Sequence, residues 1–234
     1  MFIDWRWIVS KRVINRKWEN GFFVTWDTIF DHTEDFARGT ILAKGDLFID
    51  AGAHCGMWTL QASKYYNSII AIEPTKKTVK SLRANLHGNR IRNVKVIEAA
   101  VTDKNGHRAF WNWPGGPMGN SLYYEPVTYT SDYGVSREPS IIRTITIDSL
   151  NVNPTMIKLD VEGAEYDAVV GAFHTIKRCH PKLFVEIHHP ENEQKIIDRL
   201  PGYDWLTNQR HMQPEGKTAF YQTHIIGEYG KEYQ

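Results

Sequence analysis

Apolar runs alternate with helical patterns along this chain, and the alternation predicts an α/β fold with a doubly wound, mostly parallel sheet. The first run, at 47–49, breaks into small residues before a helical pattern begins at Met57. A second run, at 69–72, ends in Glu73 and also leads into a helix. Runs of this length are typical of strands that are buried on both faces of a sheet. At 234 residues the chain is long enough for one such domain with a substantial core.

Residues 1–40 carry little of this pattern, and we expect them to form an N-terminal helical cover. Residues 1–20 mix tryptophan and isoleucine with lysine and arginine, and 26–38 has the apolar spacing of a helix. A basic amphipathic segment can lie on a membrane surface. Aromatic stripes are more often packed on a core, so we favour the cover. The main domain is then 41–234.

The stretch from Gly45 to Gly56 predicts a strand that turns through glycines into a helix at 57–66. In α/β domains this unit binds phosphate or carboxylate groups. The next helix is expected to begin after an N-cap at Thr75 and to end at Gly88.

A third strand is expected at 94–97, and Asn105 followed by Gly106 then predicts a β-hairpin turn. Residues 107–140 are the least regular part of the chain, with many aromatics around a Pro-Gly-Gly-Pro run. A long irregular segment inside a compact domain is usually functional or disordered. Two alternatives remain open for it: a substrate-side insertion that acts as a lid, and a hairpin excursion packed by its own aromatics.

Three further strands are expected, at 142–147, 156–159 and 183–190. A short turn or helix should begin at 148–149, directly after the first of them. Apolar residues recur at helical spacing from Tyr166, so a helix should follow the strand at 156–159. The last two strands, around Trp205 and at 219–221, are expected to pair antiparallel. The sheet would therefore contain one antiparallel strand.

The composition argues against several functions. The net charge is +1 at pH 7 and no basic patch stands out, so we expect no DNA partner and do not favour RNA. The two cysteines, Cys55 and Cys179, have no zinc-like spacing, which indicates a reducing compartment. No stretch has the length and apolarity of a membrane span, and the N-terminus lacks a signal-peptide pattern. We therefore expect a cytoplasmic protein, and the sequence leaves open whether it forms a homo-oligomer.

The glycine loop and Glu73 together point to a nucleoside ligand without phosphate. The loop spacing is Asp-x-Gly-x-x-x-Gly, not the Gly-x-Gly-x-x-Gly of dinucleotide-binding folds. Glu73, at the tip of the second strand, is placed to accept hydrogen bonds from two ribose hydroxyls. S-adenosylmethionine has a nucleoside and a zwitterionic amino acid but no phosphate, so it is the cofactor that we expect.

Polar residues end several of the predicted strands. In a doubly wound sheet, ligands bind outside the carboxyl ends of the strands. One acidic residue there is more often a helix cap than a ligand, but several at consecutive strand ends converge on one cleft. The residues at these ends are Asp50, Glu73, Glu98, Asp160, Glu162, Glu186 and His188.

Two stretches resemble the FkbM family of class I S-adenosylmethionine-dependent methyltransferases. They are Ile-Asp-Ala-Gly-Ala-His-Cys-Gly at 49–56 and Ile-Lys-Leu-Asp-Val-Glu-Gly-Ala-Glu at 157–165. The glycine motif is shared by all class I methyltransferases, whereas the second motif is much more specific to this family. The resemblance covers roughly residues 45–190, and it implies the Rossmann-like class I methyltransferase fold. His54 stands where the family usually has Asn.

The resemblance also implies which residues hold the cofactor. The glycine loop would lie against its methionine part, Glu73 would hold the ribose, and Asp160 would sit beside the methyl group. Residues 98–100 would flank the adenine. The full set of expected cofactor-binding residues is Asp50, Gly52, Ala53, His54, Gly56, Glu73, Glu98, Ala99, Ala100 and Asp160.

Members of this family methylate hydroxyls on sugars, glycolipids and macrolide-like natural products, which implies O-methylation of a small-molecule or glycan acceptor. A sulfonium methyl is already activated, so catalysis needs in-line alignment and a base that takes the hydroxyl proton. The expected catalytic residues are Asp160, Glu186 and His188, and an imidazole has the ordinary pKa best suited to a base. The same three could hold a divalent cation. Glu186 and His188 can share a strand face without binding anything, however, so we expect no metal and a shared role for these two.

Two other functions stay open. Lys158, Asp160 and Glu186 are loosely similar to the Lys-Asp-Lys-Glu set of RNA 2′-O-methyltransferases, although the second lysine is missing. The chain could also be a non-catalytic binding module on the same fold, although its intact cofactor set counts against this. Because a lysine in a buried strand needs a partner, we expect Lys158 to pair with a carboxylate such as that of Glu162 or Glu186.

Overall fold

The computed structural model of the chain describes residues 16–17, 23–24, 44–111, 121–122, 139–212 and 221–230. The predicted N-terminal cover at 1–40, with its helix at 26–38, lies outside the described residues apart from two short strands. These are β1 (Arg16–Lys17) and β2 (Phe23–Val24), which pair antiparallel with each other. Most of the predicted insertion at 107–140 also lies outside the described residues.

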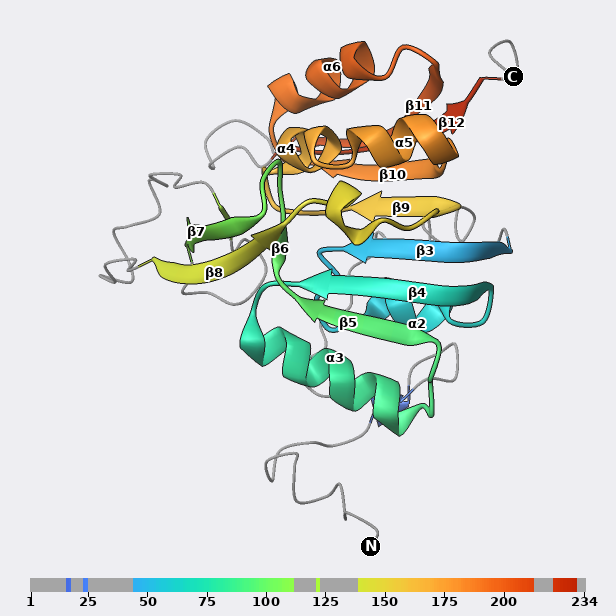
Figure 1. The fold of residues 1–234 in the computed structure, drawn as a ribbon, viewed down its shortest axis with the longest axis vertical. Helices are drawn as coiled ribbons and strands as arrows, with labels where there is room; N and C mark the ends of the chain where they lie inside the picture. Colours follow the sequence, from blue (N-terminus) through green and yellow to red (C-terminus); the bar gives the residue numbers. More distant parts are fainter. Residues whose placement is uncertain are drawn as a thin grey trace, which may run out of the picture.

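A seven-stranded sheet forms the centre of the structure, and its strands lie in the order β11-β12-β10-β9-β3-β4-β5 (Figure 1). They are β3 (Gly45–Ala51), β4 (Tyr66–Glu73), β5 (Val94–Glu98), β9 (Met156–Leu159), β10 (Lys182–Ile187), β11 (Tyr203–Met212) and β12 (Tyr221–Tyr229). β12 pairs antiparallel with both β10 and β11, and every other neighbouring pair in this sheet is parallel. The predicted α/β fold, with a mostly parallel sheet and one antiparallel strand, is confirmed.

β3 lies in the middle of this sheet, although it comes first of the seven strands in the chain. From β3 the chain moves outward to β4 and β5, and it then returns to β9 and β10 on the other side of β3 (Figure 1). In α/β sheets a crevice forms where the strand order reverses in this way, outside the carboxyl ends of the strands. The topology therefore places a binding site at the ends of β3, β4, β9 and β10.

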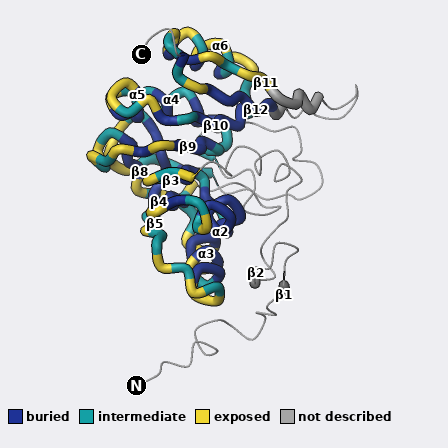
Figure 2. The backbone as a smooth tube through the Cα atoms, turned by 90° about the vertical axis from the view of Figure 1, so that its right-hand side faces the viewer, coloured by how far each residue is buried: buried dark blue, intermediate teal, exposed yellow. Residues whose placement is uncertain are grey.

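Helices cover both faces of the sheet. They are α2 (Met57–Ala62), α3 (Lys76–Gly88), α4 (Glu165–Val170), α5 (Phe173–Cys179) and α6 (Pro190–Arg199). Successive side chains of a strand point to opposite faces, so Ile49 of β3 joins a buried cluster with residues of α4, α5 and α6. Phe48 packs on the other face with Trp58 of α2, where Leu82 of α3 also lies close to α2. α2 is buried along its whole length (Figure 2).

A second, three-stranded sheet contains β6 (Ala100–Val101), β8 (Ser140–Ile145) and β7 (Gly106–Phe110), in that order. The hairpin predicted at Asn105 and Gly106 is wrong, because β8 lies between β6 and β7. Asn105 Oδ1 accepts the Thr146 N–H at 2.8 Å, and the Thr144 hydroxyl donates to the Lys104 carbonyl at 2.9 Å. The turn is thus bonded to β8 and to the residue after it, and it does not close a hairpin.

Several predicted boundaries move by a few residues. α2 ends at Ala62, earlier than predicted, because Tyr66 already begins β4 and packs against Phe48. β8 ends at Ile145, before the predicted 147, and the short helix predicted after it is a 3₁₀ turn, Asp148–Leu150. α3 ends at Gly88, as predicted.

The helix predicted after β9 is divided into α4 and α5. Gly171 lies between them, and a Cβ at this residue would be 2.1 Å from the Thr102 carbonyl oxygen. The Asp148 N–H also donates to the Gly171 carbonyl at 2.9 Å. The Asp148 carboxylate then caps α5 by accepting the N–H groups of His174 and Thr175. This close backbone contact explains why one helix pattern becomes two helices.

α6 follows β10 where the sequence predicts a strand that continues to 190. β10 ends at Ile187, and Pro190 is the first residue of the helix, where its missing N–H is not needed. Glu191 and Glu193 lie in the first turn and favour a helix N-terminus. Pro190 thus marks a helix start and not the end of a strand. None of the helices that the structure describes is both long and apolar enough to cross a membrane.

Candidate functional site

The carboxyl ends of β3, β4, β9 and β10 bring the polar strand ends to one edge of the sheet. Asp50 lies near the end of β3, Glu73 ends β4, and Glu186 lies near the end of β10. Asp160 follows β9 directly, and His188 follows β10. Residues far apart in the chain thus meet where the strand order reverses.

Gly52 lies where the loop after β3 meets the end of β9. Its φ is +77°, and a Cβ at this position would be 1.7 Å from the Asp160 carbonyl oxygen. The N–H groups of Gly52 and Ala53 both donate to the Ile72 carbonyl, at 2.9 and 3.0 Å, so the loop is also tied to β4. The positive φ and the approach of the Asp160 backbone both require glycine at this position.

Glu73 is buried, with 6% of its surface exposed, and backbone groups hold both of its carboxylate oxygens. Oε2 accepts the His54 N–H at 3.1 Å, and Oε1 accepts the Thr75 N–H at 2.9 Å. Burial raises the pKa of Glu73 to about 7, and the two N–H bonds offset only part of this increase. The side chain is therefore fixed at the end of β4, and it titrates near neutral pH.

His54 connects Glu73 to the glycine loop. Its N–H bonds to Glu73, and its backbone is left-handed, with a φ of 49°. Burial lowers the pKa of His54, while nearby Asp160 raises it and Lys158 lowers it, so that the ring is neutral at pH 7. Ring Nε2 is buried and has no hydrogen-bond partner among the described residues. A polar group of a bound ligand would satisfy this nitrogen, which fits a cofactor in the loop.

The residues predicted to flank the adenine lie beside Glu73. Glu98 ends β5 opposite Glu73, and the Ala99 N–H donates to the Glu73 carbonyl at 3.2 Å. Ala99 belongs to the buried core, however, and Ala100 is buried in β6. The fold thus places these residues next to Glu73, and their contact with a base stays a prediction.

Lys158 is buried beneath the loop and joins β3 to β9. Its Nζ donates to Asp160 Oδ2 and to the Gly52 carbonyl, both at 3.1 Å, and it lies 3.4 Å from Asp50 Oδ1. Burial by itself lowers the pKa of Lys158, but the carboxylates of Asp160, Asp50 and Glu186 outweigh burial and raise it. Lys158 is therefore charged, and it fixes the loop against the end of β9.

Lys158 pairs with carboxylates, as predicted, but its partners are Asp50 and Asp160 and not the two that the sequence suggested. Lys158 lies directly opposite Asp50 in the paired strands β9 and β3, so this carboxylate lies beside it on the same face of the sheet. Asp160 lies two residues further along the chain and returns to the same side. Glu162 instead places its carboxylate 3.4 Å from His188 Nε2, and Glu186 influences Lys158 through its charge alone.

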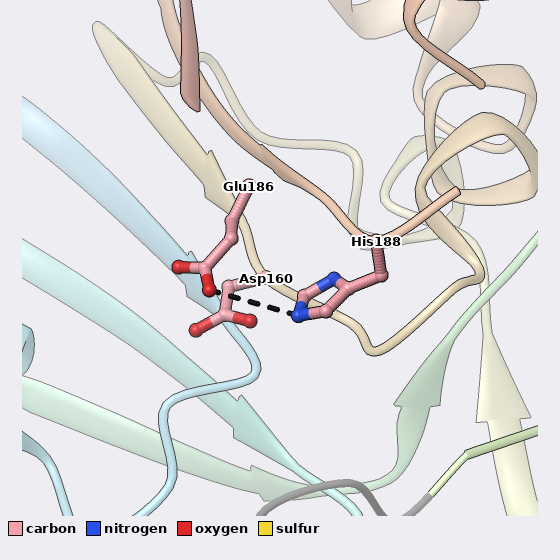
Figure 3. A group of neighbouring side chains, drawn as sticks. All are labelled: Asp160, Glu186 and His188. Atoms are coloured by element: carbon pink, nitrogen blue, oxygen red, sulfur yellow. Dashed lines mark ion pairs between the residues drawn. The ribbon is translucent and has the colours of Figure 1, made fainter. Parts of the chain in front are cut away.

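Asp160, Glu186 and His188, the predicted catalytic residues, lie together on the other side of the site (Figure 3). One ligand atom of each lies within 4.8 Å of those of the other two. His188 Nε2 is 3.6 Å from Glu186 Oε1 and 3.4 Å from Glu162 Oε2. Burial lowers the pKa of His188, but Glu162, Glu165 and Glu186 outweigh it and raise this pKa well above its ordinary value.

Glu165 is fully buried, and the sequence motifs assigned it no role. Its Oε1 accepts the Gly163 N–H at 2.6 Å and lies 2.9 Å from His188 Nδ1, while Oε2 accepts the Asn192 amide at 2.8 Å. Burial alone raises the pKa of Glu165, but the bonds from His188, Gly163 and Asn192 lower it below its ordinary value. Its position at the end of the second motif was the signal that could have identified it.

His224 of β12 is a second residue that the sequence did not reveal. Its Nε2 lies 3.2 Å from Glu186 Oε2, and its ring stacks on Phe184 with 5.3 Å between the centroids. Burial raises the pKa of Glu186, but His224, His188 and Lys158 together lower it. The contact depends on the antiparallel register that sets Glu186 opposite His224, so no local pattern in the sequence could indicate it.

A described part of the predicted insertion reaches the loop after β9. Ser121 forms an antiparallel bridge with Trp111, and its hydroxyl donates to the Glu162 carbonyl at 2.6 Å. Ser121 Oγ would also lie 3.8 Å from a Cβ at Gly163. The insertion therefore touches the side of the site that contains Asp160.

A family model described as the methyltransferase FkbM domain matches residues 50–217. The match covers most of the chain and includes all three of the predicted catalytic residues. The chain belongs to the FkbM methyltransferase family. The family predicted from the two sequence motifs is therefore confirmed. No curated protein sequence matches this FkbM family member.

Solved structures of methyltransferases have the same fold. The methyltransferase FkbM from Methylobacillus flagellatus is 19% identical, with a TM-score of 0.54 over 80% of this chain and 46% of that one. This chain thus spans about half the length of that protein. Precorrin-6y C5,15-methyltransferase from Geobacter metallireducens is 15% identical, with a TM-score of 0.53 over 93% of this chain and 98% of that one.

A third structure, M. jannaschii TYW2 in complex with AdoMet, is 11% identical, with a TM-score of 0.50 over 89% of this chain and 82% of that one. At such low identities the likeness concerns the fold alone. It confirms the Rossmann-like class I methyltransferase fold that the sequence resemblance implied.

Proposed function

We propose that this chain is an S-adenosylmethionine-dependent O-methyltransferase whose acceptor is a hydroxyl of a sugar, a glycolipid or another small natural product. The observation that carries the proposal is the pair formed by Glu73 and His54 at the glycine loop. Glu73 is a carboxylate fixed at the end of β4, and His54 offers a buried nitrogen without a hydrogen-bond partner among the described residues. Both fit a nucleoside that carries a polar amino-acid part and no phosphate.

The charges along the crevice match the two ends of this cofactor. S-adenosylmethionine has hydroxyls on its ribose and positive charge on its sulfur and its amino group. Glu73 would accept the ribose hydroxyls, and Asp160, across the loop at Gly52, would face the positive end. The TYW2 structure of the same fold is in complex with AdoMet, which supports this cofactor.

Methyl transfer to a hydroxyl needs one proton acceptor, and we expect it on the side of the site that contains Asp160. The reaction forms a bond between the acceptor oxygen and the methyl carbon, breaks the bond from sulfur to that carbon, and releases S-adenosylhomocysteine. The hydroxyl proton leaves to a base. Asp160, Glu186 and His188 lie close together. A hydroxyl that faces the methyl group can pass its proton to one of the two carboxylates, or to His188 when the pH exceeds the raised pKa of its imidazole. The protein otherwise supplies alignment, because the sulfonium methyl is already activated.

The surroundings of the site favour a small-molecule or glycan acceptor over a nucleic acid. The net charge of +1 supplies no broad basic surface. Lys158, which an RNA 2′-O-methyltransferase would need at the reaction centre, is buried between Asp50 and Asp160. Ser121 of the insertion bonds to the Glu162 carbonyl, which supports a role of the insertion in binding the acceptor. The two cysteines form no disulfide, which supports a reaction in the cytoplasm.

Calorimetry with S-adenosylhomocysteine tests the cofactor half of the proposal. We expect the chain to bind it, and Glu73→Ala to weaken binding by about 1–3 kcal/mol because the ribose hydroxyls lose their acceptor. Asp46→Asn is the matched control, since Asp46 is an exposed carboxylate at the opposite end of β3. Equal affinity in Glu73→Ala would move the nucleoside site elsewhere, and a chain that binds none of the ligand would overturn the proposal.

Mass spectrometry of the products tests the acceptor half. The chain is incubated with S-adenosylmethionine and with separate pools of sugars, glycolipids, small natural products and RNA. We expect O-methylated product from one of the first three pools. Methylation of RNA alone, or of nitrogen atoms, would contradict the proposed acceptor.

A further inference from the structure

We propose that Asp160, Glu186 and His188 together bind one divalent metal ion of the Mn²⁺ class. The sequence led us to expect no metal, and the geometry changes that expectation. Figure 3 shows both carboxylates facing the Nε2 side of the imidazole, and one ligand atom of each residue lies within 4.8 Å of the others. Three atoms that are each held about 2.1 Å from one ion lie about 3.0–3.6 Å from one another. His188 Nε2 and Glu186 Oε1 are already 3.6 Å apart, so a movement of about an ångström would close the site around an ion.

A residue outside the three ligands orients His188 for this role. Glu165 holds His188 Nδ1 at 2.9 Å and is itself fixed by the Gly163 N–H and the Asn192 amide. This bond turns Nε2 toward Glu186, at 3.6 Å. Histidines that bind metals almost always donate their second ring nitrogen to a carboxylate or carbonyl in this way.

The two carboxylate ligands are anchored from their far sides. Asp160 Oδ2 bonds to Lys158 at 3.1 Å, and Glu186 Oε2 lies 3.2 Å from His224 Nε2. Glu186 Oε1 faces His188, and Asp160 Oδ1 accepts no hydrogen bond from the part of the chain that the structure describes. Each carboxylate therefore turns one oxygen toward the space between the three ligands.

The site holds more negative charge than permanent positive charge. Lys158 is the lysine in this group, and its ion-pair partners are Asp50 and Asp160. Three more carboxylates, those of Glu162, Glu165 and Glu186, lie against the imidazole of His188. Buried carboxylates need compensating charge. A divalent ion supplies it, and protonation of His188 is the competing way to supply it. Only the first of these two sources of positive charge requires the chain to bind a metal ion, so metal binding distinguishes them.

The ligand set decides the class of ion. Two carboxylates and one imidazole suit Mn²⁺ or another first-row ion, whereas Ca²⁺ takes six to eight oxygen ligands. Three protein ligands leave coordination positions for other groups. If the proposed O-methyltransferase function holds, the acceptor hydroxyl would take one of them and would lose its proton more easily. That role rests on the proposed function, whereas binding of the ion does not.

Titration of the intact chain with Mn²⁺ alone, followed by calorimetry, tests the site. We expect one ion to bind, and Asp160→Asn and Glu186→Gln each to weaken binding at least tenfold. Glu165→Gln should weaken it by about ten- to a hundredfold, because the imidazole loses its orienting carboxylate. Asp46→Asn should bind as the unaltered chain does. Absence of binding at millimolar Mn²⁺, or equal binding in all variants, would overturn the inference.

A measurement on the unaltered chain covers the case in which a variant fails to fold. Mn²⁺ broadens the NMR signals of nearby protons, so the ring signals of His188 should disappear at substoichiometric metal. The exposed His107 should keep its signals at the same concentration. Equal broadening of both rings would show surface association only, and it would also overturn the inference.

Binding of S-adenosylhomocysteine, measured separately, keeps the two proposals apart. A chain that binds Mn²⁺ at these residues and not the nucleoside would keep the metal site and lose the proposed function. A chain that binds the nucleoside and not Mn²⁺ would lose the metal site and keep the function.

Discussion

The pKa values of buried carboxylates are shifted in opposite directions on the two sides of β3. On the β4 side, burial raises the pKa of Glu73 to about 7, because the groups of His54 and Thr75 that bond to it are neutral and Lys158 lowers the pKa only weakly from a distance. On the other side, burial also raises the pKa of Glu165 and of Glu186, but His188 and other partners outweigh it and lower both. All three side chains are almost fully buried. The partners, and not the degree of burial, therefore decide the sign of the shift.

This difference suits two kinds of ligand chemistry. A carboxylate bonded by backbone groups is suited to uncharged hydroxyls, such as those of a ribose. Ionised carboxylates paired with histidines and a lysine are suited to positive charge or to proton removal. Gly52 and Lys158 connect the two sides, since both bond to or contact Asp160. Substitutions at these positions and on each side test whether the two sides differ in this way.

The largest effect is expected from Gly52→Val, which separates the two sides. A Cβ would be 1.7 Å from the Asp160 carbonyl oxygen, and valine is strained at a φ of +77°. We expect destabilisation of about 4 kcal/mol or more, enough to prevent folding of a marginally stable domain. Soluble yield and thermal unfolding by circular dichroism measure the effect.

Gly88→Ala is the control for that variant. Gly88 ends α3, and nothing lies within 4 Å of a Cβ built there. We expect a change of less than about 1 kcal/mol, and in the stabilising direction. If Gly52→Val melted like Gly88→Ala, the loop and the end of β9 would not be held in contact in solution.

Lys158→Met is expected to have the next largest effect. The variant leaves Asp50 and Asp160 without their cation in a buried place, which costs about 3–5 kcal/mol. Lys182→Met is the matched control, because its ion pair with Glu228 has side chains that are 28% and 65% exposed. Such a pair contributes about 1 kcal/mol or less. Equal losses in urea unfolding would mean that Lys158 is not the link between the sides.

Glu73 should make the free energy of unfolding fall as pH rises. A carboxylate whose pKa is lowered by a charged partner has the opposite effect. Its pKa rises from 4.5 to about 7 on folding, so the folded chain keeps a proton that the unfolded chain loses. The contribution of Glu73 to stability is thus greatest below about pH 4.5 and is lost as pH rises through 7, a change of up to about 3 kcal/mol. Glu73→Gln removes this term. Urea unfolding at pH 5 and pH 8 should show a larger loss in the unaltered chain, and equal losses would contradict the raised pKa.

The sequence predicted those parts of the fold that depend on local pattern. The apolar run of β3 is buried on both faces, with Ile49 toward α4 to α6 and Phe48 toward α2. The hairpin at Asn105 failed because β8, which is distant in sequence, pairs with both strands. A turn motif such as Asn-Gly predicts that the chain bends. Which strand then pairs with the strand after the turn depends on the topology of the whole sheet.

The candidate site was predictable to the same extent. Parallel strands end at one edge, so Asp160, Glu186 and His188 could be grouped from their positions after strands. The partner of Lys158 and the contact of His224 with Glu186 could not, because they depend on register between strands. Glu165 was visible in its motif, but only the fold shows that it holds His188.

The smallest expected effect tests whether the insertion belongs to the acceptor side. Ser121→Ala removes the hydroxyl that bonds to the Glu162 carbonyl, a loss of about 1 kcal/mol. Ser68→Ala is the control, because Ser68 bonds a backbone carbonyl at the other end of the sheet. We expect Ser121→Ala to raise the acceptor KM about fivefold, with the affinity for S-adenosylhomocysteine unchanged, since Glu162 lies beside Asp160 and not beside Glu73. An equal change in both quantities would assign the insertion to the β4 side as well, and the division of the site at β3 would then fail.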